Sequence, residues 1–112
     1  MSIIQSIPAD VVVEHARSRV KGYLDDAHAT ARRLRAGEID WITAFNLISD
    51  MQSGVQTVCL TLEALLADYR RPARDQLGQV VELRIATQAE LQALQADLRE
   101  NNLFDGPTGS SV

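Results

Sequence analysis

The sequence predicts an all-α protein, an antiparallel up-down-up bundle of three long helices. Apolar residues recur every three or four positions along most of the chain. The two interruptions of this pattern are short, which favours antiparallel neighbours, and no β-branched run is long enough for a strand. With 112 residues, 46% of them hydrophobic, the chain has the size and composition of one globular domain.

The first helix is predicted from about residue 7 to residue 36, after an N-terminal arm of residues 1–6. Pro8 suits the first turn, and Asp10 favours the positive end of the helix dipole. Gly37 is the expected C-terminal stop, because glycine readily adopts the left-handed conformation that ends helices. The apolar face consists of Val13, Val20, Leu24, Ala27, Ala31 and Leu34.

The second helix is predicted over residues 40–70, with Asp40 as its N-cap. One apolar stripe with a seven-residue repeat consists of Trp41, Phe45, Ile48, Gln52, Val55, Cys59, Leu62, Leu66 and Tyr69. A second stripe consists of Ala44, Leu47, Met51, Gly54, Val58 and Leu65. A helix with two apolar stripes must be covered from two sides, so we expect this helix to be central.

The third helix is predicted over residues 73–101, after a break at Arg71-Pro72. A kink within one continuous helix is the alternative at this proline. The bundle is thus expected to span residues 7–104, followed by a flexible tail, residues 105–112, that is rich in glycine and serine. The stripe of the third helix consists of Leu77, Val80, Arg84, Thr87, Leu91, Leu94 and Leu98.

The positions of the two turns predict which residues face each other. Phe45 is expected opposite Ala31 on the first helix and Leu98 on the third. Gly22 and Gly54 fall at one level, either because helices approach closely there or because the glycines form a notch for a partner's side chain.

Charge and composition exclude several classes of function. Eleven basic and fifteen acidic residues give a net charge of −4, which disfavours nucleic-acid binding. No apolar run is long enough for a membrane span, and no secretion signal is recognisable, so the expected location is the cytoplasm. The single cysteine, Cys59, lies on the apolar stripe and is expected to be a small core residue.

Four charged residues form the first candidate site. Arg17 and Arg84 occupy stripe positions opposite Cys59, and Glu14 and Glu63 lie within one turn of that level. A charge on an apolar stripe is costly unless it is paired. The four residues are therefore either a polar layer that sets the register, an anion-binding or catalytic site with two arginine forks, or a contact with a partner chain.

No motif indicates an enzyme, a metal or a cofactor. Asp25 and His28 have the spacing of half a helical metal site, but no second pair completes it, and solvated side chains are the better interpretation. Phosphate-binding loops and nucleophile elbows are absent from the sequence.

Apolar residues outside the stripes predict an interaction surface, namely Ile3, Ile4, Val11, Val12, Leu60 and Leu83. Such a surface favours self-association, most simply as a homodimer. The leading hypothesis is a non-enzymatic protein-interaction module, acting through an acidic and partly apolar helical surface. It would serve as an adaptor, assembly factor or inhibitor, and a phage or mobile-element protein is one concrete version. The alternative is a small-molecule-binding bundle that uses Arg17 and Arg84.

Overall fold

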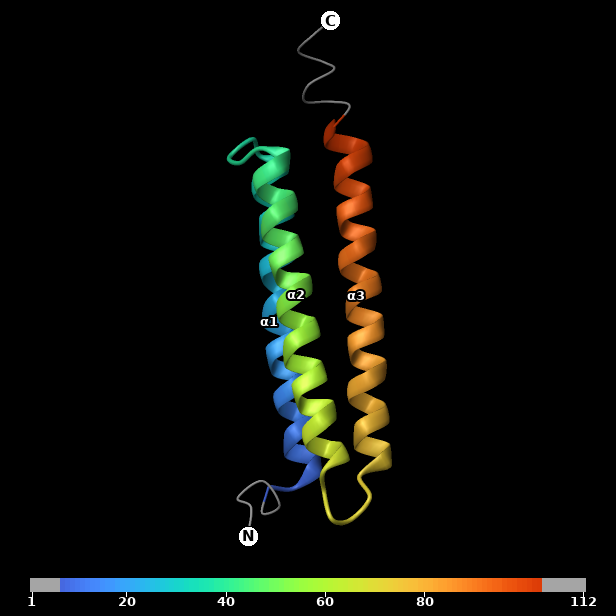
Figure 1. Ribbon diagram of the computed structural model, residues 1–112. Helices are drawn as coiled ribbons and strands as arrows, with labels where there is room; N and C mark the ends of the chain where they lie inside the picture. The colour runs from blue at the N-terminus through green and yellow to red at the C-terminus, as the bar shows by residue number, and fades with distance from the viewer. Residues whose placement is uncertain (1–6, 104–112) are drawn as a thin grey trace, which may run out of the picture.

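The computed structural model describes residues 7–103, which form three helices: α1 (Ala9–Arg35), α2 (Trp41–Ala67) and α3 (Arg74–Leu103). α1 and α3 run in the same direction and α2 runs in the opposite one (Figure 1). The described residues contain no strand. The predicted all-α, up-down-up, three-helix bundle is therefore confirmed.

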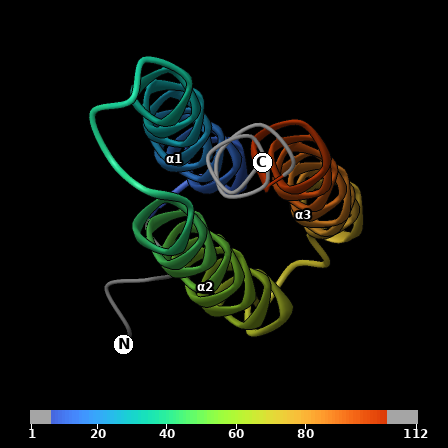
Figure 2. The ribbon, with the colours of Figure 1, turned by 90° about the horizontal axis from the view of Figure 1, so that it is seen from above.

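The three helices stand at the corners of a triangle when they are seen end on (Figure 2). Each helix contacts both of the others. α2 does bury residues from both predicted stripes, but α1 and α3 also meet each other, so the packing is triangular rather than layered. The largest fully buried side chains come from all three helices: Val20, Ile48, Val55, Cys59, Leu66, Val80, Leu91 and Leu98.

Local backbone chemistry sets the turn between α1 and α2. Gly37 has a φ of 77°, which places it in the left-handed region where glycine is favoured. The N–H of Gly37 donates to the carbonyl of Leu34, and the N–H of Glu38 donates to the carbonyl of Arg33. These two bonds are those of a Schellman motif, so Gly37 ends α1 as predicted.

The predicted N-cap of α2 is also present. Oδ1 of Asp40 accepts a hydrogen bond of 2.8 Å from the backbone N–H of Thr43. Hydrogen bonds from the side chain of Thr43, and then from its backbone, lower the pKa of the Asp40 carboxyl group. At the start of α1, by contrast, Pro8 occupies the N-cap itself rather than the first turn, and it supplies no side-chain cap.

α2 ends at Ala67, three residues before the predicted end, and residues 68–73 form the connection to α3. The N–H groups of Asp68 and Tyr69 bond three residues back, to Leu65 and Leu66, which tightens the last turn and stops the helix. Pro72 therefore lies in a break between helices and not in a kinked one.

Hydrogen bonds between α2 and α3 agree with the predicted register to within one helical turn. Gln88 Nε2 donates to the carbonyl of Gln52 at 2.8 Å, and Gln95 Nε2 donates to Ser49 Oγ at 3.1 Å. The prediction for Phe45 was wrong, since this side chain is 42% exposed. The neighbouring Ala44 and Ile48 occupy the inward positions, so Phe45 lies further round the helix.

The two mid-helix glycines have different surroundings. A Cβ atom on Gly54 would lie 2.6 Å from the ring of Tyr23, which packs over this position from α1. Gly22 has open space where its Cβ would be. Close helix packing therefore explains Gly54, whereas nothing in the structure explains Gly22.

Candidate protein-interaction site

The three sides of the bundle, where two helices meet at the surface, differ in chemistry. The α1/α3 side is crossed by charged pairs. Arg35 pairs with Asp97 at 3.0 Å and His28 with Glu90 at 3.1 Å, and both pairs link residues 62 positions apart. Gln76 also donates to Asp10 on this side. Polar side chains thus engage one another across the α1/α3 side.

The middle of the α2/α3 side is crossed instead by uncharged polar side chains, and one ion pair, Arg84–Glu63, crosses this side near Leu60. The amide of Gln52 donates to Gln95 Oε1 at 3.0 Å, and Gln88 donates to Gln56 Oε1 at 3.4 Å. Gln95 also donates to the backbone carbonyl of Phe45. Glutamine amides carry dipoles but no net charge, so this stretch costs less to desolvate than the ion pairs of the α1/α3 side.

An apolar hollow lies at the Trp41 end of this side. Its volume is about 580 Å³, and its lining consists of Trp41, Phe45, Gln92, Gln95, Ala96, Arg99 and Glu100. The rings of Trp41 and Phe45 lie 5.6 Å apart between centroids, in a tilted arrangement. The Trp41 ring is half-buried, whereas Phe45 presents its ring to the surface. An accessible aromatic pair of this kind is typical of an anchor point for a partner.

A second apolar group lies about four turns along the same side. Leu60 is 42% exposed and Ile85 is 59% exposed. The register of the glutamine bonds places Ile85 at the level of Leu60. Ile42, which is 68% exposed, lies five full helical turns before Leu60 and so on the same flank of α2.

We refer to this surface as the α2/α3 face. It is defined by six residues of α2 and six of α3: Ile42, Phe45, Ser49, Gln52, Gln56, Leu60, Ile85, Gln88, Gln92, Gln95, Ala96 and Arg99. Among these twelve residues Arg99 alone is charged. The face is therefore apolar at both ends and neutral and polar in its middle, and its charged neighbours, Glu100 and the Arg84–Glu63 pair, lie at its two ends.

The predicted arginine and glutamate residues form two separate pairs. Arg84 binds Glu63 with two hydrogen bonds, of 2.6 and 3.2 Å, at the edge of the α2/α3 face. These side chains are only 22% and 13% exposed, and the hydrogen bonds that Arg84 donates to Glu63 raise the pKa of Arg84. Arg17 binds Glu14 at 2.8 Å and Gln79 at 3.1 Å on the α1/α3 side. The four residues thus form no single layer, and each arginine is held by its own glutamate.

The remaining candidates for a catalytic or metal-binding role are Cys59, Asp25 and His28, and their contacts do not bring them together in one site. Cys59 is buried in the core, where burial, and then the charge of Glu63, raise the pKa of its thiol. Asp25 pairs with Lys21 at 2.7 Å, whereas His28 faces Glu90, so Asp25 and His28 do not act together. Residues 7–103 contain no group of three or more side chains suited to hold a metal ion.

Only some of the residues predicted to form an interaction surface are exposed in the structure. Val11 and Leu60 are exposed, as expected. The prediction for Val12 was wrong, because it is 4% exposed and belongs to the core, and Leu83 is half-buried against that core. Ile3 and Ile4 lie outside the described residues.

Sequence reasoning missed three members of the α2/α3 face, namely Ile42, Phe45 and Ile85. Phe45 shares the seven-residue repeat of true core positions, and periodicity alone does not separate a core position from a flanking one. Ile85 could have been predicted, because it is an apolar residue outside the apolar stripe of α3. Leu83 was predicted to be exposed on the same criterion.

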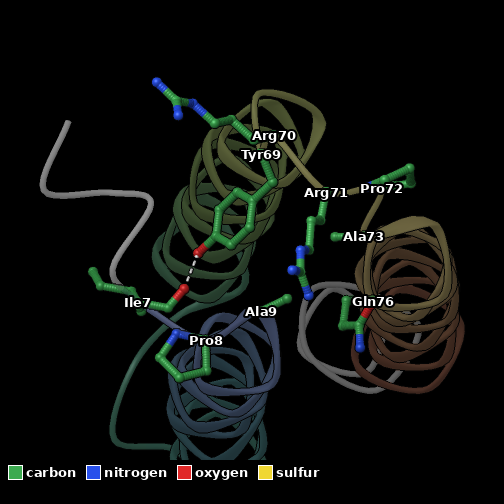
Figure 3. A pocket seen from close by; sticks show the side chains of 9 residues that line it. All are labelled: Ile7, Pro8, Ala9, Tyr69, Arg70, Arg71, Pro72, Ala73 and Gln76. Carbon is green, nitrogen blue, oxygen red and sulfur yellow. Dashed lines mark hydrogen bonds between the residues drawn. The ribbon is translucent and has the colours of Figure 1, made fainter. Parts of the chain in front are cut away.

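A second hollow, of about 540 Å³, lies at the opposite end of the bundle, beside the turn between α2 and α3. The hydroxyl of Tyr69 donates to the backbone carbonyl of Ile7 at 2.7 Å, which ties this turn to the start of α1 (Figure 3). The side chain of Arg71 lies between Ala9 and Gln76, whereas that of Arg70 points away (Figure 3). This hollow is as open as the first, its lining is about half polar and half apolar, and Tyr69 is the one aromatic residue in that lining.

Comparison with protein-family models, with curated proteins and with solved structures finds no match to this chain. None of the helices in residues 7–103 combines the length and apolar character that crossing a membrane requires. The function must therefore be argued from the surface itself.

Proposed function

We propose that this protein is a non-enzymatic protein-interaction module and that the α2/α3 face is its binding surface. The observation that carries the proposal is the exposure of Phe45, Leu60 and Ile85 at the two ends of a face whose middle carries no charge. A partner helix with apolar side chains at both ends of its contact and polar, uncharged ones between them would complement this face.

The energetics of such a contact are favourable. Full burial of one large apolar side chain contributes about 1.5–3 kcal/mol. The four exposed apolar residues of the face, Ile42, Phe45, Leu60 and Ile85, are 42–68% exposed, so each can contribute only the corresponding part of this gain. Part of this gain offsets the loss of translational and rotational freedom on binding. The glutamine amides can exchange their hydrogen bonds with a partner, so the middle of the face supplies specificity rather than affinity.

Acidic residues surround the face rather than form it. Asp50 and Glu82 are exposed on neighbouring flanks of α2 and α3, and the chain carries a net charge of −4. These two carboxylates lie outside the face, so they leave its centre free for the apolar side chains of a partner. An adaptor, an assembly factor or an inhibitor, whether encoded by a cell or by a phage, works through contacts of this kind.

The alternative, a small-molecule site built on Arg17 and Arg84, has less geometric support. The two arginines lie on different sides of the bundle, and each donates to a glutamate. An anionic ligand would have to displace both glutamates before two guanidinium groups could hold it.

The test is affinity capture from extracts of the native host, using wild-type protein and two matched variants. Ile85→Asp places a charge on the α2/α3 face, whereas Val11→Asp places the same charge on α1 at a side chain of similar exposure, 53% against 59%. We expect proteins captured by the wild type to be retained by Val11→Asp and lost by Ile85→Asp. Equal capture by all three proteins would contradict the assignment of the face.

A further inference from the structure

We infer that the α2/α3 face binds a second copy of this chain, in a symmetric and antiparallel dimer. This inference rests on the proposed function, since it names the occupant of the same face. Three properties of the face argue for a second copy: the placement of its apolar groups, the placement of its charges, and its area.

The apolar groups are placed for contact with an identical face. Phe45 and Leu60 are 15 residues apart on α2, which is about 22 Å, with polar uncharged residues between them. A two-fold axis perpendicular to the helices, at the level between Gln52 and Gln56, would bring the Phe45 end of each copy onto the Leu60 and Ile85 end of the other. Phe45 of each copy would then pack against Leu60 and Ile85 of the other copy, so the same contact would form twice. A two-fold interface requires this kind of self-complementarity.

The charged residues at the edges of the face would also meet in balanced groups. Arg99 and Glu100 lie at the Phe45 end, and the Arg84–Glu63 pair lies beyond Leu60. The same axis would place Arg99 and Glu100 of one copy beside Glu63 and Arg84 of the other. Each end of the interface would then hold two positive and two negative charges, with no net repulsion.

The area of the face is that of a small biological interface. From Ile42 to Leu60 the face is about 27 Å long, and two adjacent helices are about 20 Å wide. Each copy would bury about 540 Å², or roughly 1,080 Å² in total, which is just above the ~1,000 Å² expected of a biological interface.

The first test measures molar mass by size-exclusion chromatography with light scattering, at tens of micromolar protein. We expect the wild type and Val11→Asp to have twice the mass of the 12.3 kDa chain, and Ile85→Asp to have the mass of a monomer. Circular dichroism of each variant verifies that it is folded. A monomeric wild type, or a dimer that survives Ile85→Asp in folded form, would overturn the inference.

The second test determines the orientation of the two copies. Gln92 is exposed, and in the antiparallel arrangement it lies next to the two-fold axis, opposite Gln92 of the other copy. We expect Gln92→Cys to form a disulfide-linked dimer on mild oxidation, whereas Ser18→Cys, on the outer surface of α1, should not. Absence of a link through position 92 would overturn the antiparallel arrangement, because parallel copies would bring α3 against α2 instead.

The two proposals can fail separately. If the wild type is monomeric but still captures host proteins in an Ile85-dependent manner, the dimer is wrong and the interaction function remains. If capture also ignores Ile85→Asp, the α2/α3 face is not a binding surface, and both proposals are wrong.

Discussion

Gly22 and Gly54 illustrate how identical residues inside helices differ once the neighbouring helix is in place. Glycine costs about 1 kcal/mol relative to alanine inside a helix, and this cost applies at both positions. At Gly54 the ring of Tyr23 fills the space of a side chain, whereas at Gly22 that space is open. The packing of Tyr23 therefore requires a glycine at position 54, whereas an alanine at position 22 would fit and would stabilise the helix.

The first prediction follows from this comparison. Gly22→Ala should raise the free energy of unfolding by about 1 kcal/mol, because nothing opposes the gain in helix propensity. Gly54→Ala should gain nothing or be destabilising, because its Cβ forces the Tyr23 ring to move, and overpacking of this kind costs about 1–3 kcal/mol. Urea denaturation of both variants measures the difference. Combining Gly54→Ala with Tyr23→Ala serves as the control, since removal of the ring should restore the benefit of the alanine.

The pair between Arg84 and Glu63 leads to the second prediction. Both side chains are largely shielded, so Arg84→Met alone should lower stability by about 1–3 kcal/mol, because it leaves the Glu63 carboxylate without its donor. The double variant Arg84→Met with Glu63→Leu should recover most of this loss, because two apolar groups leave no charge to desolvate. Thermal denaturation of the two single variants and the double variant measures the coupling. A double variant as unstable as the sum of both single variants would show that the residues do not interact.

At the scale of the element, the ends of the helices are set by short-range bonds. Gly37 ends α1 through its left-handed backbone, and Asp40 begins α2 through its bond to Thr43. Only two residues, Glu38 and Ile39, lie between Gly37 and Asp40, so α2 reverses direction directly after α1. Both signals can be recognised in the sequence because each depends on one residue and its nearest neighbours.

The third prediction concerns the cap of α2 and its dependence on pH. The hydrogen bonds from Thr43 lower the pKa of Asp40 below its ordinary value of 3.8. A lowered pKa in the folded state means that the carboxylate stabilises the fold above pH 3.8 and that this contribution is lost as the pH falls through the folded-state pKa. Asp40→Ala should therefore be less stable than wild type at neutral pH, and the difference should shrink in acid. Urea denaturation across this pH range measures it, with Asp50→Ala as a control for an exposed aspartate away from the cap.

At the scale of the whole molecule, the three helices share one core. Its members come from α1, α2 and α3, and every pair of helices is in contact. No helix can leave without exposing the apolar faces of the other two. Small domains with a single core of this kind usually unfold in one cooperative step.

The fourth prediction is that unfolding is cooperative along the full length of the bundle. Trp41 is the first residue of α2, so it lies at one end of the bundle, and it is the single tryptophan of the chain, so its fluorescence reports on that end. Circular dichroism reports on all three helices. We expect both signals to change at the same urea concentration. An earlier change in fluorescence would show that the Trp41 end opens separately from the rest.

The sequence alone determined the fold class and the caps at Gly37 and Asp40, and it favoured three helices with a break at Pro72 over a kink in one continuous helix. These features follow from repeating apolar patterns and from hydrogen bonds between residues close in sequence, both of which can be recognised from the order of the residues. The end of α2 was predicted at residue 70, three residues after its actual end at Ala67. The hydrogen bonds that close its last turn, from residue i+3 to residue i, do not alter the apolar pattern of the sequence.

Only the tertiary structure decided which flank of each helix stays exposed. Phe45 and Ile48 share one stripe in the sequence, yet Phe45 lies on the surface and Ile48 in the core. Arg17 and Arg84 were expected to lie together opposite Cys59. In the structure Arg17 lies on the α1/α3 side, beside Gln79, whereas Arg84 lies on the α2/α3 side, beside Glu63. The physical reason is that a helical repeat defines an apolar arc around the axis, whereas the directions of the two neighbouring helices decide which part of that arc is covered.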